Sequence, residues 1–92
     1  MKRSRYKVLS VGAIRRGTSE RTGNGWLAQD VVLEEITDET PYPESFIAQM
    51  PAEMVGKIQE GNMVECTPFI KVREYNDRYY NEVRIRNMMP CF

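Results

Sequence analysis

The chain has 92 residues, of which 41% are apolar and 28% charged, and its 13 basic side chains equal its 13 acidic ones in number. This composition excludes a disordered or low-complexity chain and indicates one globular domain over residues 1–92 with a modest core. The chain has no histidine, and its two cysteines, Cys66 and Cys91, lack metal-ligand spacing. We therefore expect free thiols, no metal and no cofactor.

Charge is distributed unevenly along the chain. Residues 1–25 carry seven Lys/Arg and one Glu (+6), residues 26–60 one Lys and eight acids (−7), and residues 61–92 five basic and four acidic groups (+1). A basic surface for nucleic acid forms only if the fold segregates these charges. The basic start lacks the apolar region of a signal peptide, and no run reaches transmembrane length. We expect a cytoplasmic protein with no membrane association.

The first half of the chain predicts three strands. Residues 5–16 alternate in polarity and form the first, with a bulge or bend at Gly12. Residues 17–25 are a loop by composition. Residues 26–35 form the second strand, with Leu27, Val31 and Leu33 facing the core, so that Trp26 points outward. A turn over 37–43 leads to the third strand, residues 44–50.

The second half predicts one helix and two strands. Residues 51–61 fit a short helix that starts at Pro51 and stops at Gly61. Residues 62–75 form the fourth strand, with an edge or bulge near Pro68, and residues 78–88 form the fifth. Five strands with a short helix between the third and fourth make an all-β fold, the five-stranded Greek-key barrel called the OB-fold. An SH3-like barrel is the alternative, but it does not place a helix there.

The last two strands can be paired by their side chains. With Asn76-Asp77 as the loop, apolar positions and opposite charges face each other. The pairs on one side are Ile70–Val83 and Val72–Asn81, and those on the other are Lys71–Glu82, Arg73–Tyr80 and Phe69–Arg84. A slip by one residue would set Ile70 against Arg84, so it is disfavoured.

This register places basic and aromatic side chains together on one solvent-facing surface: Phe69, Lys71, Arg73, Tyr75, Tyr80, Arg84 and Arg86. Such pairs stabilise an ordinary solvated hairpin. They are also suited to nucleic acid, because arginines contact phosphates and aromatic rings stack on bases. Trp26, beside the 17–25 loop, is expected at the mouth of the usual OB-fold ligand cleft. Alternatively, Trp26 covers the core and does not contact a ligand.

Three segments carry a resemblance to a known family: GNGWLAQDVVLEE (23–35), YPESFIAQM (42–50) and EGNMVECTPFIKVREYNDRYYNEVRIRNM (60–88). They resemble a small bacterial family of single-OB-fold proteins of unassigned function, common in Bacteroides-type bacteria and similar to reduced single-stranded-DNA-binding proteins. The resemblance covers about residues 5–88. It implies an OB-fold, and by analogy a binding activity. The positions that match the family pattern are Trp26, Arg73, Tyr75, Tyr80 and Arg84.

An enzyme is disfavoured. Without histidine, the commonest general base and metal ligand is missing. The segment GTSERTGNG (17–25) lacks the Lys-Ser/Thr ending of a phosphate-binding loop. The carboxylates of EEITDETPYPE (34–44) are typical of a solvated acidic turn, and their spacing matches no EF-hand.

Two hypotheses remain. The first is a module that binds single-stranded DNA or RNA with little sequence preference. Its candidate contact residues are Arg15, Arg16, Arg21, Trp26, Phe69, Lys71, Arg73, Tyr75, Arg78, Tyr80, Arg84 and Arg86. The second is a protein-interaction module without nucleic-acid binding, in which the same surface contacts another protein or a second copy. A homodimer would cover the open edge expected of a partly open barrel, and Pro68 limits where that edge can pair.

Overall fold

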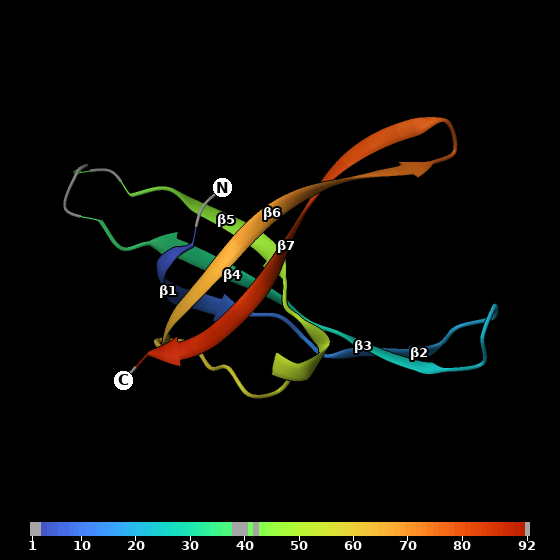
Figure 1. Ribbon diagram of the computed structural model, residues 1–92, viewed down its shortest axis with the longest axis horizontal. Helices are drawn as coiled ribbons and strands as arrows, with labels where there is room; N and C mark the ends of the chain where they lie inside the picture. Colours follow the sequence, from blue (N-terminus) through green and yellow to red (C-terminus); the bar gives the residue numbers. More distant parts are fainter. Residues whose placement is uncertain (1–2, 38–40, 42, 92) are drawn as a thin grey trace.

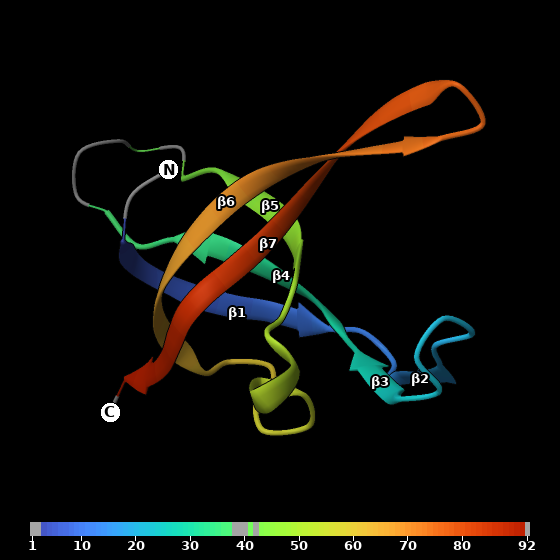
Figure 2. The same ribbon diagram turned by 45° about the vertical axis from the view of Figure 1, so that its right-hand side comes forward.

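The computed structural model describes residues 3–37, 41 and 43–91, which form a barrel from which two long hairpins project (Figures 1 and 2). The strands are β1 (Ser4–Val11), β2 (Arg15–Thr18), β3 (Gly25–Ala28), β4 (Asp30–Glu35), β5 (Ser45–Gln49), β6 (Met63–Tyr75) and β7 (Arg78–Cys91). A 3₁₀ turn, η1 (Ala52–Met54), follows β5. The two projecting hairpins are named here the β2–β3 arm (residues 15–28) and the β6–β7 arm (residues 69–84).

The barrel has the strand order of an OB-fold, so the predicted fold class is confirmed. Its five strands close in the order β1-β4-β5-β7-β6, and β6 pairs again with β1. All neighbours are antiparallel except β5 and β7, which run parallel and are joined at one residue pair, Gln49 with Arg84. The barrel is therefore closed rather than partly open.

The core is built from the alternate residues of each barrel strand. Val8, Leu33, Val64 and Cys66 have no exposed surface. These side chains belong to β1, β4 and β6, and the period-2 geometry of a strand turns them all to the barrel axis. These buried side chains form the core of the barrel from which the two arms project.

The first two predicted strands are each two strands. The chain leaves the barrel at Gly12, whose N–H donates to the Asp30 carbonyl at 2.8 Å, and returns at Gln29. The bulge on β1 lies between Val8 and Ser10 and not at Gly12, where the strand has already ended. The predicted loop over 17–25 is right for residues 19–24 and wrong at its ends, because Gly17 and Thr18 belong to β2 and Gly25 to β3. A period-2 pattern is the same in a barrel strand and in a projecting hairpin, so it does not mark the exit point.

Leu27 does not face the core, and that prediction is wrong. Its side chain is 42% exposed, while Ala28 and Gln29 are both buried. Two consecutive buried residues shift the alternation by one position at the junction of β3 and β4. Val31 and Leu33, beyond this shift, are core residues as predicted. Trp26 is 48% exposed, as expected, because the arm has left the barrel.

The pairing predicted for β6 and β7 is confirmed at all five proposed pairs. Asn76 and Asp77 have φ values of 51° and 60°, which makes the connection a type I′ turn. Pro68 lies beyond Cys66, the last residue of β6 that is recorded as paired with β1, so the predicted edge position is also confirmed. β7 extends to Cys91, three residues past the predicted end at 88.

Both faces of the β6–β7 arm are exposed, because the arm extends past the barrel. The basic face consists of Phe69, Lys71, Arg73 and Tyr75 on β6 with Arg78, Tyr80, Glu82 and Arg84 on β7. The apolar face consists of Ile70, Val72 and Glu74 with Tyr79, Asn81 and Val83. Ile70 and Val72 are 57% and 61% exposed, although they lie on the same side of β6 as the core residues nearer the start of that strand.

The helix predicted over 51–61 is wrong, because only the 3₁₀ turn η1 forms there. Gly56 and Gly61 have φ values of 79° and 89°, and Val55 has a ψ of 128°, so the backbone leaves the helical region immediately after Met54. In the described part of the chain, no helix is long and apolar enough to cross a membrane. The turn predicted over 37–43 includes residues 38–40 and 42, which lie outside the described residues.

Candidate nucleic-acid interface

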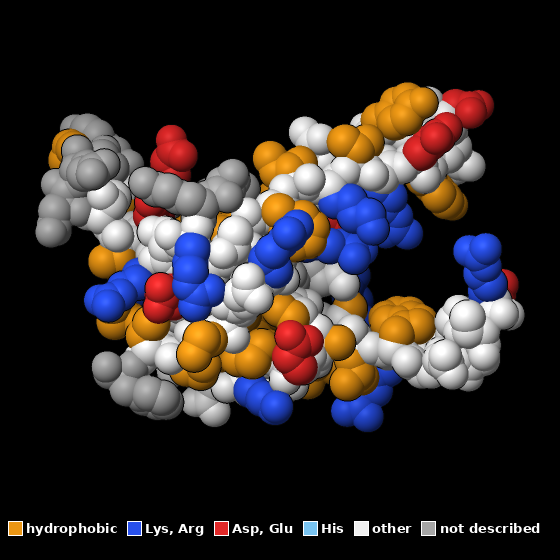
Figure 3. Space-filling model, viewed as in Figure 1, with side chains coloured by type: hydrophobic (Ala, Val, Ile, Leu, Met, Phe, Trp, Pro, Cys, Tyr) orange, Lys and Arg blue, Asp and Glu red, His pale blue; other side chains and the backbone are white. Residues whose placement is uncertain are grey.

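The two arms leave the barrel on the same side and leave a hollow between them (Figures 1 and 3). Figure 3 shows Lys and Arg side chains on the side of the β6–β7 arm that faces the β2–β3 arm, and hydrophobic side chains on the side that faces away. The cleft between the arms has a volume of about 380 Å³. Its lining residues are Arg15, Trp26, Leu27, Ala28, Gln49, Arg73, Glu82 and Arg84.

Trp26 lies over a glycine of the neighbouring strand. Gly17 and Trp26 are directly paired across the β2–β3 arm. A Cβ atom on Gly17 would lie 2.9 Å from Nε1 of Trp26 and closer still to two carbons of its ring. The indole therefore packs against the Gly17 backbone where any other residue would place its side chain. The ring is half exposed, and it lines both the cleft and a second hollow of about 520 Å³ with Arg16 and Ala52.

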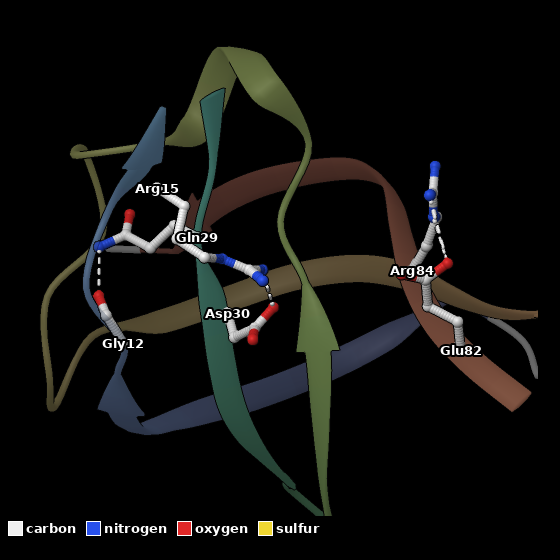
Figure 4. Close-up of polar contacts among 6 residues, drawn as sticks. All are labelled: Gly12, Arg15, Gln29, Asp30, Glu82 and Arg84. Atoms are coloured by element: carbon white, nitrogen blue, oxygen red, sulfur yellow. Dashed lines mark hydrogen bonds and ion pairs between the residues drawn. The ribbon is translucent and has the colours of Figure 1, made fainter. Parts of the chain in front are cut away.

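Two ion pairs moderate the charge of the cleft (Figure 4). At the root of the β2–β3 arm, Nη2 of Arg15 lies 3.2 Å from Oδ1 of Asp30. On β7, Nη2 of Arg84 lies 3.2 Å from Oε2 of Glu82. The side chains of Arg15 and Arg84 are 57% and 36% exposed, so both pairs are screened by water and are weak. Within the described residues, Arg73 has no carboxylate partner. The cleft lining holds three arginines and one carboxylate, that of Glu82, for a net charge of +2, and Asp30 beside Arg15 lowers it to +1.

The basic face continues the cleft toward the tip of the β6–β7 arm. Arg73, Tyr75 and Tyr80 line a hollow of about 400 Å³ there. Tyr75 and Tyr80 are 62% and 48% exposed, so their rings are available for stacking. At the barrel end, the guanidinium of Arg86 lies 4.0 Å from the centre of the Phe69 ring, which is a cation–π contact.

The structure brings most of the predicted contact residues together, but not all of them. Arg15, Trp26, Arg73 and Arg84 line one cleft, and Arg16, Phe69, Tyr75 and Tyr80 line hollows beside it. Arg21, Lys71, Arg78 and Arg86 line none of these hollows. Arg15 and Arg16 lie on strand β2.

Sequence reasoning missed several lining residues, among them Gly17, Leu27 and Gln49. Gly17 was assigned to a loop, Leu27 to the core, and Gln49 to no role. The signal for Gly17 was present, because a hairpin centred on residues 21 and 22 pairs it with Trp26. No signal in the sequence places Gln49 beside Arg84, since that contact depends on barrel closure.

The described residues offer little reactive chemistry. Among them, no group of three or more Cys, Asp and Glu side chains could hold a metal ion. Cys66 is fully buried, and burial raises the pKa of its thiol to about 11, so the thiol is protonated at neutral pH. Cys91 is also a free thiol. The exposed arginines and aromatic rings of the arrangement are suited to contacts with anions and flat rings.

Comparisons of the chain with protein-family models, with curated proteins and with solved structures find no match.

Proposed function

We propose that the protein binds single-stranded DNA or RNA in the cleft between its arms, with little sequence preference. The observation that carries this proposal is the cleft itself. Trp26 and Arg15 on one arm and Arg73 and Arg84 on the other, far apart in the sequence, line one hollow of about 380 Å³. Paired positive charge and exposed aromatic surface are the two components of such sites.

The chemistry assigns a role to each group. Arg73 contacts a phosphate directly, since no carboxylate competes for it within the described residues. Arg84 and Arg15 exchange Glu82 and Asp30 for further phosphates, and the exchange costs least at Arg15, because the Arg15–Asp30 pair is solvent-exposed whereas the Arg84–Glu82 pair is partly buried. Bases stack on Trp26 and on the rings at the tip of the other arm. Because every base has a π-face, this contact tolerates any sequence.

The test is a titration with a fluorescent oligothymidylate of about 16 nucleotides, the upper site size of one OB-fold, at about 50 and about 200 mM salt. Binding through Z phosphates weakens with a log–log slope of about −0.7Z. Arg73→Ala should make the slope shallower by about 0.7, because one phosphate contact is lost. Lys7→Ala is the matched control, since Lys7 is exposed on β1 and lines none of the hollows. Absence of binding at low salt excludes the proposal.

The proposal also covers the protein family and the cellular location. We place the chain with the small single-OB-fold family described above. In support, all five positions that match its pattern line the cleft or the hollow beside it. We also assign the protein to the cytoplasm, because Cys66 and Cys91 are free and a reducing compartment keeps thiols in that state.

A second candidate is a protein-interaction or self-association module, favoured by the apolar face of the β6–β7 arm. Ile70, Val72 and Tyr79 are 57%, 61% and 71% exposed there, and contiguous apolar surface of this kind marks contact sites. Light scattering at rising protein concentration tests self-association. A mass above that of the monomer, lowered by Val72→Thr, supports this candidate. A monomer mass throughout excludes self-association.

A further inference from the structure

We infer that Gln29 is a positioning residue that fixes the β2–β3 arm, and with it Trp26, relative to the barrel. Gln29 lies where the chain returns from the arm, between the end of β3 and the start of β4. Its side chain is polar, yet the residue is only 6% exposed, and it is the one buried polar residue of the described chain. A buried amide of this kind requires partners for both of its polar atoms.

Both atoms have partners, and the partners belong to different segments. Nε2 donates to the Gly12 carbonyl at 2.9 Å, and Oε1 accepts from the Gly56 N–H at 2.9 Å. Gly12 is the residue at which the chain enters the arm, and Gly56 belongs to the turn that follows η1. Figure 4 shows the amide of Gln29 directed toward Gly12. One side chain therefore links the start of the arm, its end and a third segment of the barrel.

The backbone around Gln29 reinforces the same junction. The Gln29 carbonyl accepts from the Met50 N–H at 3.0 Å, and the Gly12 N–H donates to the Asp30 carbonyl at 2.8 Å. Gly56 has a φ of 79°, a conformation that favours glycine and that other side chains adopt with strain. The exposed Arg15–Asp30 pair at the same root is weak, so the buried amide is the stronger side-chain link.

The amide cannot be replaced by a related side chain. The junction needs one donor, for the Gly12 carbonyl, and one acceptor, for the Gly56 N–H. A carboxylate supplies the acceptor only, and a thioether supplies neither strong group. Glutamine alone among side chains of this length offers both. A two-stranded hairpin outside a barrel is only marginally stable alone, so this anchor determines how freely the arm moves.

The consequence for binding rests on the proposed function. Trp26 and Arg15 are carried by the β2–β3 arm, whereas Arg73 and Arg84 are carried by the other arm. The distance between these two sets is set by the angle of the β2–β3 arm to the barrel. A fixed arm holds the cleft open at one width before a ligand arrives, and a preorganised site binds more tightly than one that must be ordered on binding.

The test uses the free protein first. Trp26 is the only tryptophan of the chain, so time-resolved fluorescence anisotropy reports the motion of this arm alone. Gln29→Met has a similar volume but forms neither hydrogen bond. We expect it to lower the residual anisotropy of Trp26 on the nanosecond timescale. Gln29→Glu keeps the acceptor for Gly56 but sets a carboxylate oxygen against the Gly12 carbonyl, so it should lower the residual anisotropy as well.

A stability control separates positioning from general destabilisation. Val64→Ala removes buried core volume on the part of β6 that pairs with β1, and it leaves the arm root intact. It should lower the thermal midpoint while the anisotropy of Trp26 stays as in the wild type. The inference is overturned if Gln29→Met leaves the anisotropy unchanged, or if Val64→Ala lowers it equally.

Oligonucleotide titration then tests the consequence for binding. Gln29→Met should weaken binding about threefold to tenfold, through lost preorganisation. In a Trp26→Ala background the same change should cost clearly less, because the positioned group is absent. A loosened arm with unchanged affinity would refute the effect on binding. If the wild type binds no oligonucleotide, the proposed function fails, and the anisotropy still decides whether Gln29 fixes the arm.

Discussion

Replacing Gly17 by alanine should disable the tryptophan platform without changing any charge. The cross-strand pair of Gly17 and Trp26 leaves no room for a side chain at position 17. The new Cβ would lie 2.9 Å from Nε1 and closer still to two ring carbons, whereas ordinary contacts begin near 3.4 Å. The β2 backbone is held by its pairing with β3, so the indole must turn away.

The size of the effect follows from what the ring contributes. Base stacking on an aromatic side chain contributes about 1–3 kcal/mol. Its complete loss would weaken oligonucleotide binding about 5-fold to about 150-fold. Gly17 has no left-handed φ, so alanine adopts its conformation without strain. We expect the thermal midpoint to stay the same or to rise slightly, because glycine is the weaker strand residue.

The assay is the quenching of Trp26 fluorescence during titration with oligothymidylate, together with a thermal melt. Gly25→Ala is a matched control on the opposite strand of the same arm, because a Cβ there meets only the Gly17 carbonyl oxygen, at 3.8 Å. Gly17→Ala should lose both affinity and quenching, whereas Gly25→Ala should keep both. Equal affinity for the two variants would refute the platform. A large drop in the melting temperature of Gly17→Ala alone would show that the ring is structural.

Three more outcomes are expected. Trp26→Ala should weaken oligonucleotide binding by about 1–3 kcal/mol in titrations and change the thermal midpoint little; a large loss of stability with unchanged binding would contradict this. Glu82→Gln removes the ion pair that a phosphate must displace from Arg84, so binding should tighten while the salt slope stays the same, because Arg84 contacts a phosphate in both forms; a slope steeper by about 0.7 would show that Arg84 keeps Glu82 in the wild-type complex. Burial raises the pKa of the Cys66 thiol from 9.0 to about 11. As the pH rises, the thiol therefore loses its proton in the unfolded chain before it does so in the folded protein. The free energy of unfolding should consequently fall between about pH 9 and about pH 11, by up to about 2 kcal/mol. Denaturant melts of Cys66→Ala should lack that part of the decrease, and identical curves would show that the thiol does not cause it.

The sequence predicted the β6–β7 register because two independent signals agree there. Apolar residues meet apolar ones, opposite charges meet, and Asn76-Asp77 tolerates the positive φ values of a type I′ turn. The short helix failed for the opposite reason. The apolar residues of 51–61 have helical spacing, but Gly56 and Gly61 adopt positive φ values, which a right-handed helix does not contain. The spacing of apolar residues does not reveal the φ angle of the backbone.

The candidate site was predicted in its residue types more than in its arrangement. Alternation identified Trp26 as outward-facing, but it could not show that β3 had left the barrel. Because alternation does not show where the chain leaves the barrel, Leu27 was expected in the core and Gly17 in a loop. The cleft combines residues near position 26 with residues near positions 73 and 84, and their proximity depends on the closure of the barrel. Closure is a property of the whole fold, so no local pattern reports it.

The single pair that joins β5 to β7 makes one side of the barrel a weak seam. The other barrel interfaces are ladders of several residue pairs, whereas this one depends on Gln49 and Arg84 alone. Native-state hydrogen exchange should therefore detect opening at this seam at a lower free energy than at β1–β4 or β6–β7. Both residues also line the cleft, so a ligand that contacts both would stabilise the pairing of β5 with β7. Occupancy would then be measurable at a distance from the ligand, as slower exchange of the amides at the ends of β5 and β7.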